Sequence, residues 1–180
     1  MDIQIRPATR SDVAPLQELI ARSVRALSIG YYSYDQIERS IVAVFGVDTQ
    51  LVDDGTYFVA EIGYETAGCG GWSRRSTMYG GDQAKSSIDA EIDPRRMPAR
   101  IRAFFVDPAH ARRGVGRSLL EACEDAARRA GFASSELVAT LPGVPLYAAF
   151  GYVAVEPVSV DLGDGQSLPC VRMTRNLAFA

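Results

Sequence analysis

The sequence has few of the residues that build metal and disulfide sites. Among its 180 residues are three cysteines and one histidine. Cys69, Cys123 and Cys170 are widely spaced and form no Cys-x-x-Cys pair, so the sequence predicts neither a disulfide framework nor a zinc site. With a single histidine available, we expect no metal in the protein.

Long hydrophobic runs and a strong net charge are also missing. The longest apolar runs, such as 41–45, are far shorter than the roughly 20 residues that span a bilayer. The first six residues contain no apolar signal region, so we expect a cytoplasmic protein with no membrane partner. The net charge of −3 is too small to favour nucleic acid, which leaves small molecules as the expected partners.

The length and composition fit one globular domain over residues 1–180, because 47% of the residues are hydrophobic and no repeat or linker divides the chain. Hydrophobic periodicity and the positions of proline and glycine predict a mixed α/β sheet. We expect strands at 3–7, 56–62, 66–72, 99–106, 136–139, 152–160 and 167–176, and helices from about 11, over 34–44, over 114–130 and over 143–150.

The strand over 99–106 is predicted to be central because it is apolar on both faces. Simple alternation assigns Ile101, Ala103 and Phe105 to one face, and Phe104 and Val106 to the other.

Two irregular segments are candidates for a substrate pocket. The connector after the first helix contains Tyr31, Tyr32 and Tyr34, which either line a pocket or pack the connector onto the body. The segment over 73–98 is too long for a simple connection and is either a lid or a mobile segment. Its acidic residues either attract a cationic amine or are simply solvated; they are Asp82, Asp89, Glu91 and Asp93.

The stretch from Phe104 to Leu120 predicts an anion site: an apolar strand, a basic glycine loop and the start of an amphipathic helix. The first amides of a helix lack partners and carry partial positive charge, so they attract phosphate oxygens. Gly114 and Gly116 permit a close approach. Three arginines add charge that can neutralise a pyrophosphate, namely Arg112, Arg113 and Arg117. An ordinary surface loop with solvated arginines is the alternative.

The loop matches neither a dinucleotide fingerprint, whose third glycine is missing, nor a P-loop, because no Gly-Lys-Ser/Thr occurs. It resembles the pyrophosphate loop of the GCN5-related N-acetyltransferases, whose pattern is Gln or Arg, two residues, Gly, one residue, then Gly or Ala. The match runs from Ala111 to Gly116, with Ala111 in place of the usual Gln or Arg. The preceding Val106-Asp107-Pro108 also matches the strand end and proline of that family.

A second stretch, Leu146 to Tyr152, resembles the other marker of this family, a tyrosine followed by a glycine and an aromatic residue. The order of the elements also agrees with that family: a strand, the glycine loop, a helix, a second strand and then the tyrosine. The chain departs from the family at Thr140 and Gly143, where Asn and Ala are common.

The resemblance implies a mostly antiparallel central sheet flanked by helices, in the order β-α-α-β-β-β-α-β-α-β-β. It also implies transfer of an acetyl group from acetyl-CoA to a primary amine of a small molecule or peptide, by direct attack in a ternary complex and without metal. The acetyl-CoA site would comprise Phe105, Val106, Arg112, Arg113, Gly114, Val115, Gly116, Arg117, Thr140 and Tyr147.

The resemblance assigns catalysis to Tyr147, as the proton donor to the departing CoA thiolate; the alternative is that Tyr147 only packs against the cofactor. The sequence does not identify a base. Glu61 is a candidate by chemistry alone. His110 lies at the phosphate loop, where we expect it to be a surface or CoA-contacting residue rather than the base. Arg100 occupies the strand position where some family members carry a glutamate base, which favours a water relay.

Two other function classes stay open. One is a non-catalytic acyl-CoA-binding or interaction domain, to which Ala111, Thr140 and the missing base point. The other is a transferase for a longer acyl group or an oxygen acceptor. The sequence identifies neither the acceptor nor whether the chain forms a homodimer.

Overall fold

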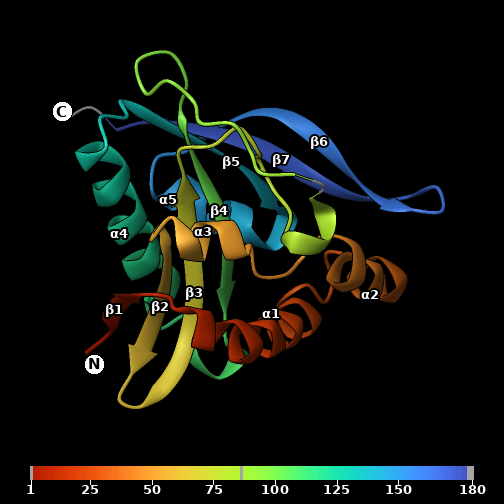
Figure 1. The fold of residues 1–180 in the computed structure, drawn as a ribbon. Coiled ribbons are helices and arrows are strands. Elements are labelled where there is room, and N and C mark those ends of the chain that lie inside the picture. The colour runs from red at the N-terminus through yellow and green to blue at the C-terminus, as the bar shows by residue number, and fades with distance from the viewer. Residues whose placement is uncertain (1, 86, 178–180) are drawn as a thin grey trace.

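A computed structural model describes residues 2–85 and 87–177 (Figure 1). Its centre is a seven-stranded sheet in the order β1-β2-β3-β4-β5-β7-β6. All neighbouring strands are antiparallel except β4 and β5, which are parallel. This confirms the predicted fold class. The strands are β1 (Gln4–Pro7), β2 (Tyr57–Ile62), β3 (Glu65–Ser73), β4 (Ala99–Val106), β5 (Ser134–Thr140), β6 (Val153–Gly163) and β7 (Gln166–Asn176).

Helices cover both faces of the sheet. The helices α1 (Val13–Leu27), α2 (Tyr34–Ala43) and α3 (Thr49–Asp53) bury apolar residues against one face. The helices α4 (Val115–Arg129) and α5 (Val144–Ala149) do so on the other. Single 3-10 turns lie at Arg10–Asp12, Asp82–Ala84, Pro108–His110 and Leu141–Gly143. None of these helices combines the length and apolarity needed to cross a membrane.

Local capping explains where the first helices begin. Thr9 and Asp12 form a capping box before the turn that leads into α1. Ser33 forms a second one at α2, where its side chain accepts a hydrogen bond from the Gln36 amide. The short helix α3 was not predicted from periodicity; Asp48 caps it by accepting from the Gln50 amide at 3.1 Å.

The parallel pairing of β4 with β5 is very short. Only two residue pairs are in register, Ala99 with Ser135 and Arg100 with Glu136. Along its other edge, β4 pairs with β3 up to Val106. The β5-facing edge of β4 beyond Arg100 is therefore left without a strand partner.

A bulge at Ala103 changes which residues of β4 share a face. Ala103 has a φ of 55°, and the register with β3 slips between Cys69 and Gly71. The buried Tyr57 hydroxyl donates a hydrogen bond of 3.2 Å to the Ala103 carbonyl.

Because of the bulge, the alternation predicted from the sequence is wrong. Ile101 packs on the α4 side with Phe104 and Val106, whereas Ala103 and Phe105 pack on the α1 side. The prediction of a central strand with two apolar faces is consistent with the fourth position of β4 in the sheet.

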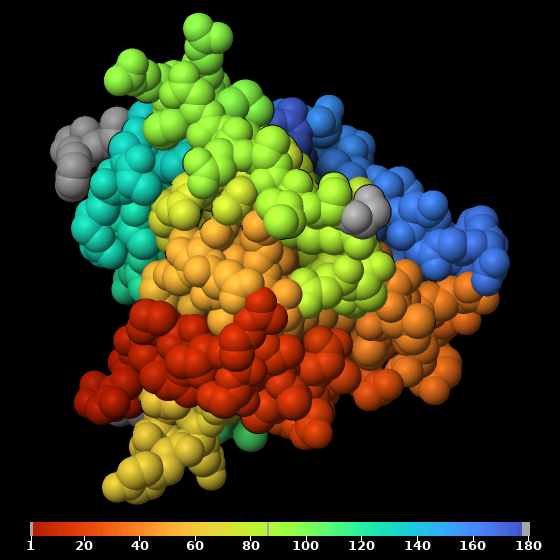
Figure 2. Space-filling model, in the orientation of Figure 1, coloured from red at the N-terminus to blue at the C-terminus, as the bar shows by residue number. Residues whose placement is uncertain are grey.

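The long segment over 74–98 is anchored by a buried cluster of four charged side chains, which we call the ion cluster: Asp48, Lys85, Asp89 and Arg102. Asp48 pairs with Lys85 at 2.5 Å and with Arg102 at 2.8 Å, and Lys85 pairs with Asp89 at 2.8 Å. Arg102 also donates to the Gly80 carbonyl. In Figure 2 the described part of this segment lies directly on α3 and its surroundings.

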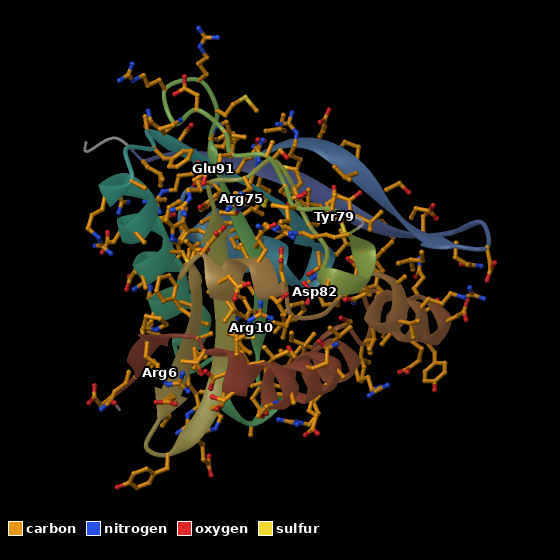
Figure 3. The ribbon with its side chains drawn as sticks, viewed as in Figure 1. Arg6, Arg10, Arg75, Tyr79, Asp82 and Glu91 are labelled. Atoms are coloured by element: carbon orange, nitrogen blue, oxygen red, sulfur yellow. The ribbon has the colours of Figure 1, made fainter. Side chains whose placement is uncertain are left out.

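The other acidic residues of the segment also have partners within the chain. Asp82 accepts from the Thr49 amide at 2.9 Å, Glu91 accepts from Arg74 at 3.1 Å, and Asp93 accepts from the Arg95 amide at 3.0 Å. Figure 3 shows Glu91 beside Arg75, whose guanidinium pairs with Asp54 at 2.7 Å. Each of these carboxylates therefore has a partner within the chain, and none of them lines the cavity described below.

The three cysteines are free and buried. Burial raises the pKa of the Cys69 thiol to about 12 and that of Cys170 to about 11.

The ion cluster generates a prediction about stability. Arg102→Met leaves two buried carboxylates facing one lysine, so we expect it to lower the free energy of unfolding by about 3–5 kcal/mol. The matched control is Arg10→Met, which breaks the exposed ion pair with Asp53 and should leave stability nearly unchanged. Urea unfolding followed by circular dichroism measures both. Equal losses in the two variants would contradict the anchoring role.

Candidate active site

One cavity of about 690 Å³ opens where β4 and β5 separate, and it joins the two faces of the sheet. Along its middle run residues 101–106 of β4, with Val138 and Thr140 of β5. The start of α4 and the helix α5 line it on one face. The end of α1, the residues after α2 and residues 78–81 line it on the other.

The glycine loop forms the α4 end of the cavity. Arg112 and Gly114 have φ values of 62° and 90°, and this left-handed backbone turns the chain into α4. A side chain at Gly116 would begin 3.0 Å from Leu146 Cδ2 and 3.8 Å from Val106 Cγ2. Because Gly116 has none, the first turn of α4 stays open to the cavity.

Most of the residues that the sequence predicts for an acetyl-CoA site lie around this one cavity. These are Phe105, Val106, Arg112, Gly114, Val115, Gly116, Arg117, Thr140 and Tyr147. Arg113 does not line it, because its guanidinium lies 3.3 Å from His110 Nδ1. His110 is itself buried, and its Nε2 lies 3.1 Å from a Glu65 carboxylate oxygen. His110 is therefore neither a surface residue nor part of the cavity wall.

Tyr147 lies on α5 with its ring buried at the wall of the cavity. The ring packs edge-on against Phe104 and Tyr152, with centroid distances of 6.2 and 5.7 Å. No described residue forms a hydrogen bond with the Tyr147 hydroxyl, whereas the Tyr152 hydroxyl lies 2.7 Å from Ser135 Oγ. Burial raises the pKa of Tyr147 well above its ordinary value, so the phenol keeps its proton.

The three tyrosines of the connector have different surroundings. Tyr31 lines the cavity, and Tyr34 is exposed. The Tyr32 hydroxyl donates to the Pro169 carbonyl and accepts from the Leu141 amide, both at 2.8 Å. Tyr32 therefore holds the connector against the start of α5 and the strand β7.

Neither Glu61, the strand residue considered as a base, nor Arg100, which occupies the position of a family glutamate, lies at the cavity. Glu61 pairs with Arg6 at 2.9 Å, next to β1, where Figure 3 labels Arg6. Arg100 is buried and pairs with Glu136. The charged residues that line the cavity are Arg102, Arg112 and Arg117, without any Asp, Glu, His or Lys. The described residues contain no group of three potential metal ligands.

One wall of the cavity is made by residues 44–46 and 78–81. The second range belongs to the segment over 73–98, which the sequence singled out as a candidate for a pocket, whereas the sequence did not identify 44–46 or its contact with that segment. These residues come from two distant segments, and the ion cluster brings them together: Asp48 follows the first segment, while Arg102 holds the Gly80 carbonyl of the second. No local pattern signals such a contact.

Comparison with known proteins agrees with this geometry. Residues 53–154 match the family model of the acetyltransferase (GNAT) domain. This is more than half of the chain, which therefore belongs to the GCN5-related N-acetyltransferase family. No curated protein sequence matches the chain significantly.

Solved structures share the fold over nearly the whole chain. A GCN5-related N-acetyltransferase from Rhodopseudomonas palustris has a TM-score of 0.73 at 20% identity, covering 98% of this chain and 96% of its own. The PaiA N-acetyltransferase from Thermoplasma acidophilum, in complex with coenzyme A, has a TM-score of 0.66 at 16% identity, and the match covers 98% of this chain and 99% of PaiA. YncA from Salmonella typhimurium, solved with its cofactor acetyl-CoA, has a TM-score of 0.65 at 19% identity, and the match covers 100% of this chain and 96% of YncA.

Proposed function

We propose that residues 1–180 form one N-acetyltransferase domain, which moves an acetyl group from acetyl-CoA to a primary amine by direct attack in a ternary complex. The observation that carries this proposal is the cavity that passes between the separated strands β4 and β5. It has an open helix N-terminus at one end and a protonated tyrosine in its wall.

The residues present fit acetyl-CoA. The pyrophosphate would lie on the amides from Arg112 to Arg117, where a helix start and two cavity-lining arginines favour anions. The pantetheine arm would pair with the β4 backbone around Phe105 and Val106, which has no strand partner on that edge. The relatives PaiA and YncA, solved with coenzyme A and acetyl-CoA, support this choice of co-substrate.

The chemistry needs a neutral amine and a proton for the leaving group. The amine nitrogen attacks the thioester carbonyl, the carbon–sulfur bond breaks, and Tyr147 gives its proton to the thiolate. The nitrogen loses a proton as the amide forms, and that proton returns through water to the Tyr147 phenolate. A lysine-like amine has a pKa of about 10.4 and must first lose a proton. With no carboxylate or imidazole in the cavity lining, that proton goes to water. The main contribution of the site is then to position the two substrates.

A second candidate function rests on the same lack of a base in the cavity lining: a domain that binds acyl-CoA without transferring the acyl group. It predicts binding of acetyl-CoA and no thiol release with any amine, so a screen of amines with thiol release as the readout separates the two.

The phosphate cradle is tested by Gly116→Glu. A carboxylate beside the pyrophosphate costs several kcal/mol, so we expect acetyl-CoA to bind roughly 100-fold more weakly in calorimetry. Gly116→Ala is the control, because the one tight contact of its methyl group is with the flexible end of Leu146, so it should weaken binding much less. Unchanged binding in Gly116→Glu would exclude the cradle, and a parent protein that does not bind acetyl-CoA would exclude both functions.

The role of Tyr147 is tested by Tyr147→Phe. Loss of a general acid should lower kcat by about 100-fold or more, with little change in acetyl-CoA binding. Tyr152→Phe is the matched control: it removes a neighbouring buried hydroxyl that bonds to Ser135, so it should lower stability and leave kcat close to that of the parent. Equal kcat in Tyr147→Phe and the parent would assign Tyr147 to packing alone.

The dependence on pH follows from the same groups. Tyr147 holds its proton beyond the ordinary phenol pKa of about 10, so it imposes no loss of activity below that pH. We expect kcat/KM for a lysine-like acceptor to rise about tenfold per pH unit until the pKa of the amine is reached. A plateau that begins near pH 7 would instead reveal a titrating base on the protein.

A further inference from the structure

The wall of the cavity on the α1 side is large, apolar and partly open. It is built by Leu27 at the end of α1, Tyr31, Phe45, Met78 and Tyr79. Leu27, Tyr31 and Tyr79 are 37%, 51% and 40% exposed. Large apolar side chains that stay accessible in a concave site are typical of a wall that a ligand covers.

This wall, which we call the acceptor wall, offers no charge to a ligand. Its one charged neighbour is Arg102, whose guanidinium is 1% exposed and pairs with Asp48 at 2.8 Å. Arg102 also donates to the Gly80 carbonyl. Each of the two cations in the ion cluster is matched by a carboxylate, so the cluster has no net charge.

Two carboxylates of the segment that carries Met78 and Tyr79 already have partners within the described chain. Asp89 is bound by Lys85 and by the Thr77 hydroxyl. Asp82, which Figure 3 shows close to Tyr79, accepts from the Thr49 amide. The cavity lining itself contains no carboxylate, so a second ammonium group on a substrate would lose its hydration at the acceptor wall without gaining an anion there.

We propose that the acceptor is an apolar primary monoamine, aromatic or branched aliphatic, with no second charged group. This inference rests on the proposed acetyl transfer and names the substrate class of that same site. Burial against the acceptor wall favours the neutral form of the amine, because desolvation disfavours the ammonium ion. The apolar wall thus both selects the substrate and helps to supply it in the form that attacks.

The first experiment compares acceptors at saturating acetyl-CoA. The amines are 2-phenylethylamine, isoamylamine, spermidine, lysine and a short peptide with a free N-terminus, and thiol release is the readout. We expect kcat/KM for the two apolar monoamines to exceed that for spermidine and lysine by at least about tenfold. Equal or higher values for spermidine, lysine or the peptide would overturn the inference.

A pair of variants links the preference to the acceptor wall. Leu27→Glu places a carboxylate in the wall, and Leu27→Gln has nearly the same shape without the charge. We expect the ratio of kcat/KM for 2-phenylethylamine to that for spermidine to fall about tenfold further in Leu27→Glu than in Leu27→Gln. Equal ratios in the two variants would mean that this wall does not contact the acceptor.

Calorimetry separates failure of this inference from failure of the proposed function. The same amines are titrated into the protein saturated with coenzyme A. If none of these amines releases thiol, acetyl transfer to them is excluded, and the order of binding still tests the wall. Tighter binding of 2-phenylethylamine than of spermidine supports the inference, whereas the reverse order, or no binding of any amine, overturns it.

Discussion

The early separation of β4 from β5 is the constraint on which the candidate site depends. The two strands share only the positions of Ala99 and Arg100, and the buried pair of Arg100 with Glu136 lies at the last of them. Beyond it, the peptide groups on one edge of β4 need partners that no strand provides. The cavity occupies that opening, and the glycine loop and α5 lie beside it.

A second constraint acts from the opposite face, where buried ion pairs attach an irregular segment to the sheet. Removing a charged side chain from water costs several kcal/mol, so each member of the ion cluster can stay buried and charged only while its partners are present. Arg102 belongs to β4, Asp48 precedes α3, and Lys85 and Asp89 belong to the irregular segment. The cluster thereby fixes residues 78–81 relative to the strand that lines the middle of the cavity.

The sequence predicted the features that depend on neighbours along the chain. The start of the first helix near residue 11, the turn at Gly114 and the placement of Tyr147 on a short helix are local, and each was found where expected. The bulge at Ala103 was missed because Phe104, Phe105 and Val106 are all apolar, so the sequence fits either assignment of faces. The register slip itself depends on the pairing with β3. From the sequence alone, Asp89 cannot be told from a solvated acidic residue, because only folding brings Arg102 beside it. Likewise, only the pairing of β2 with β1 sets Glu61 against Arg6, away from the cavity.

The buried cysteines also make the folded chain inert toward oxidants and thiol reagents. The thiolate is the reactive form, and burial keeps Cys69, Cys123 and Cys170 protonated and out of reach. A chromogenic disulfide added to the native protein would therefore report the liberated coenzyme alone. The three sulfurs would begin to react only as the chain unfolds, so the same reagent also measures how much of a preparation has lost its structure.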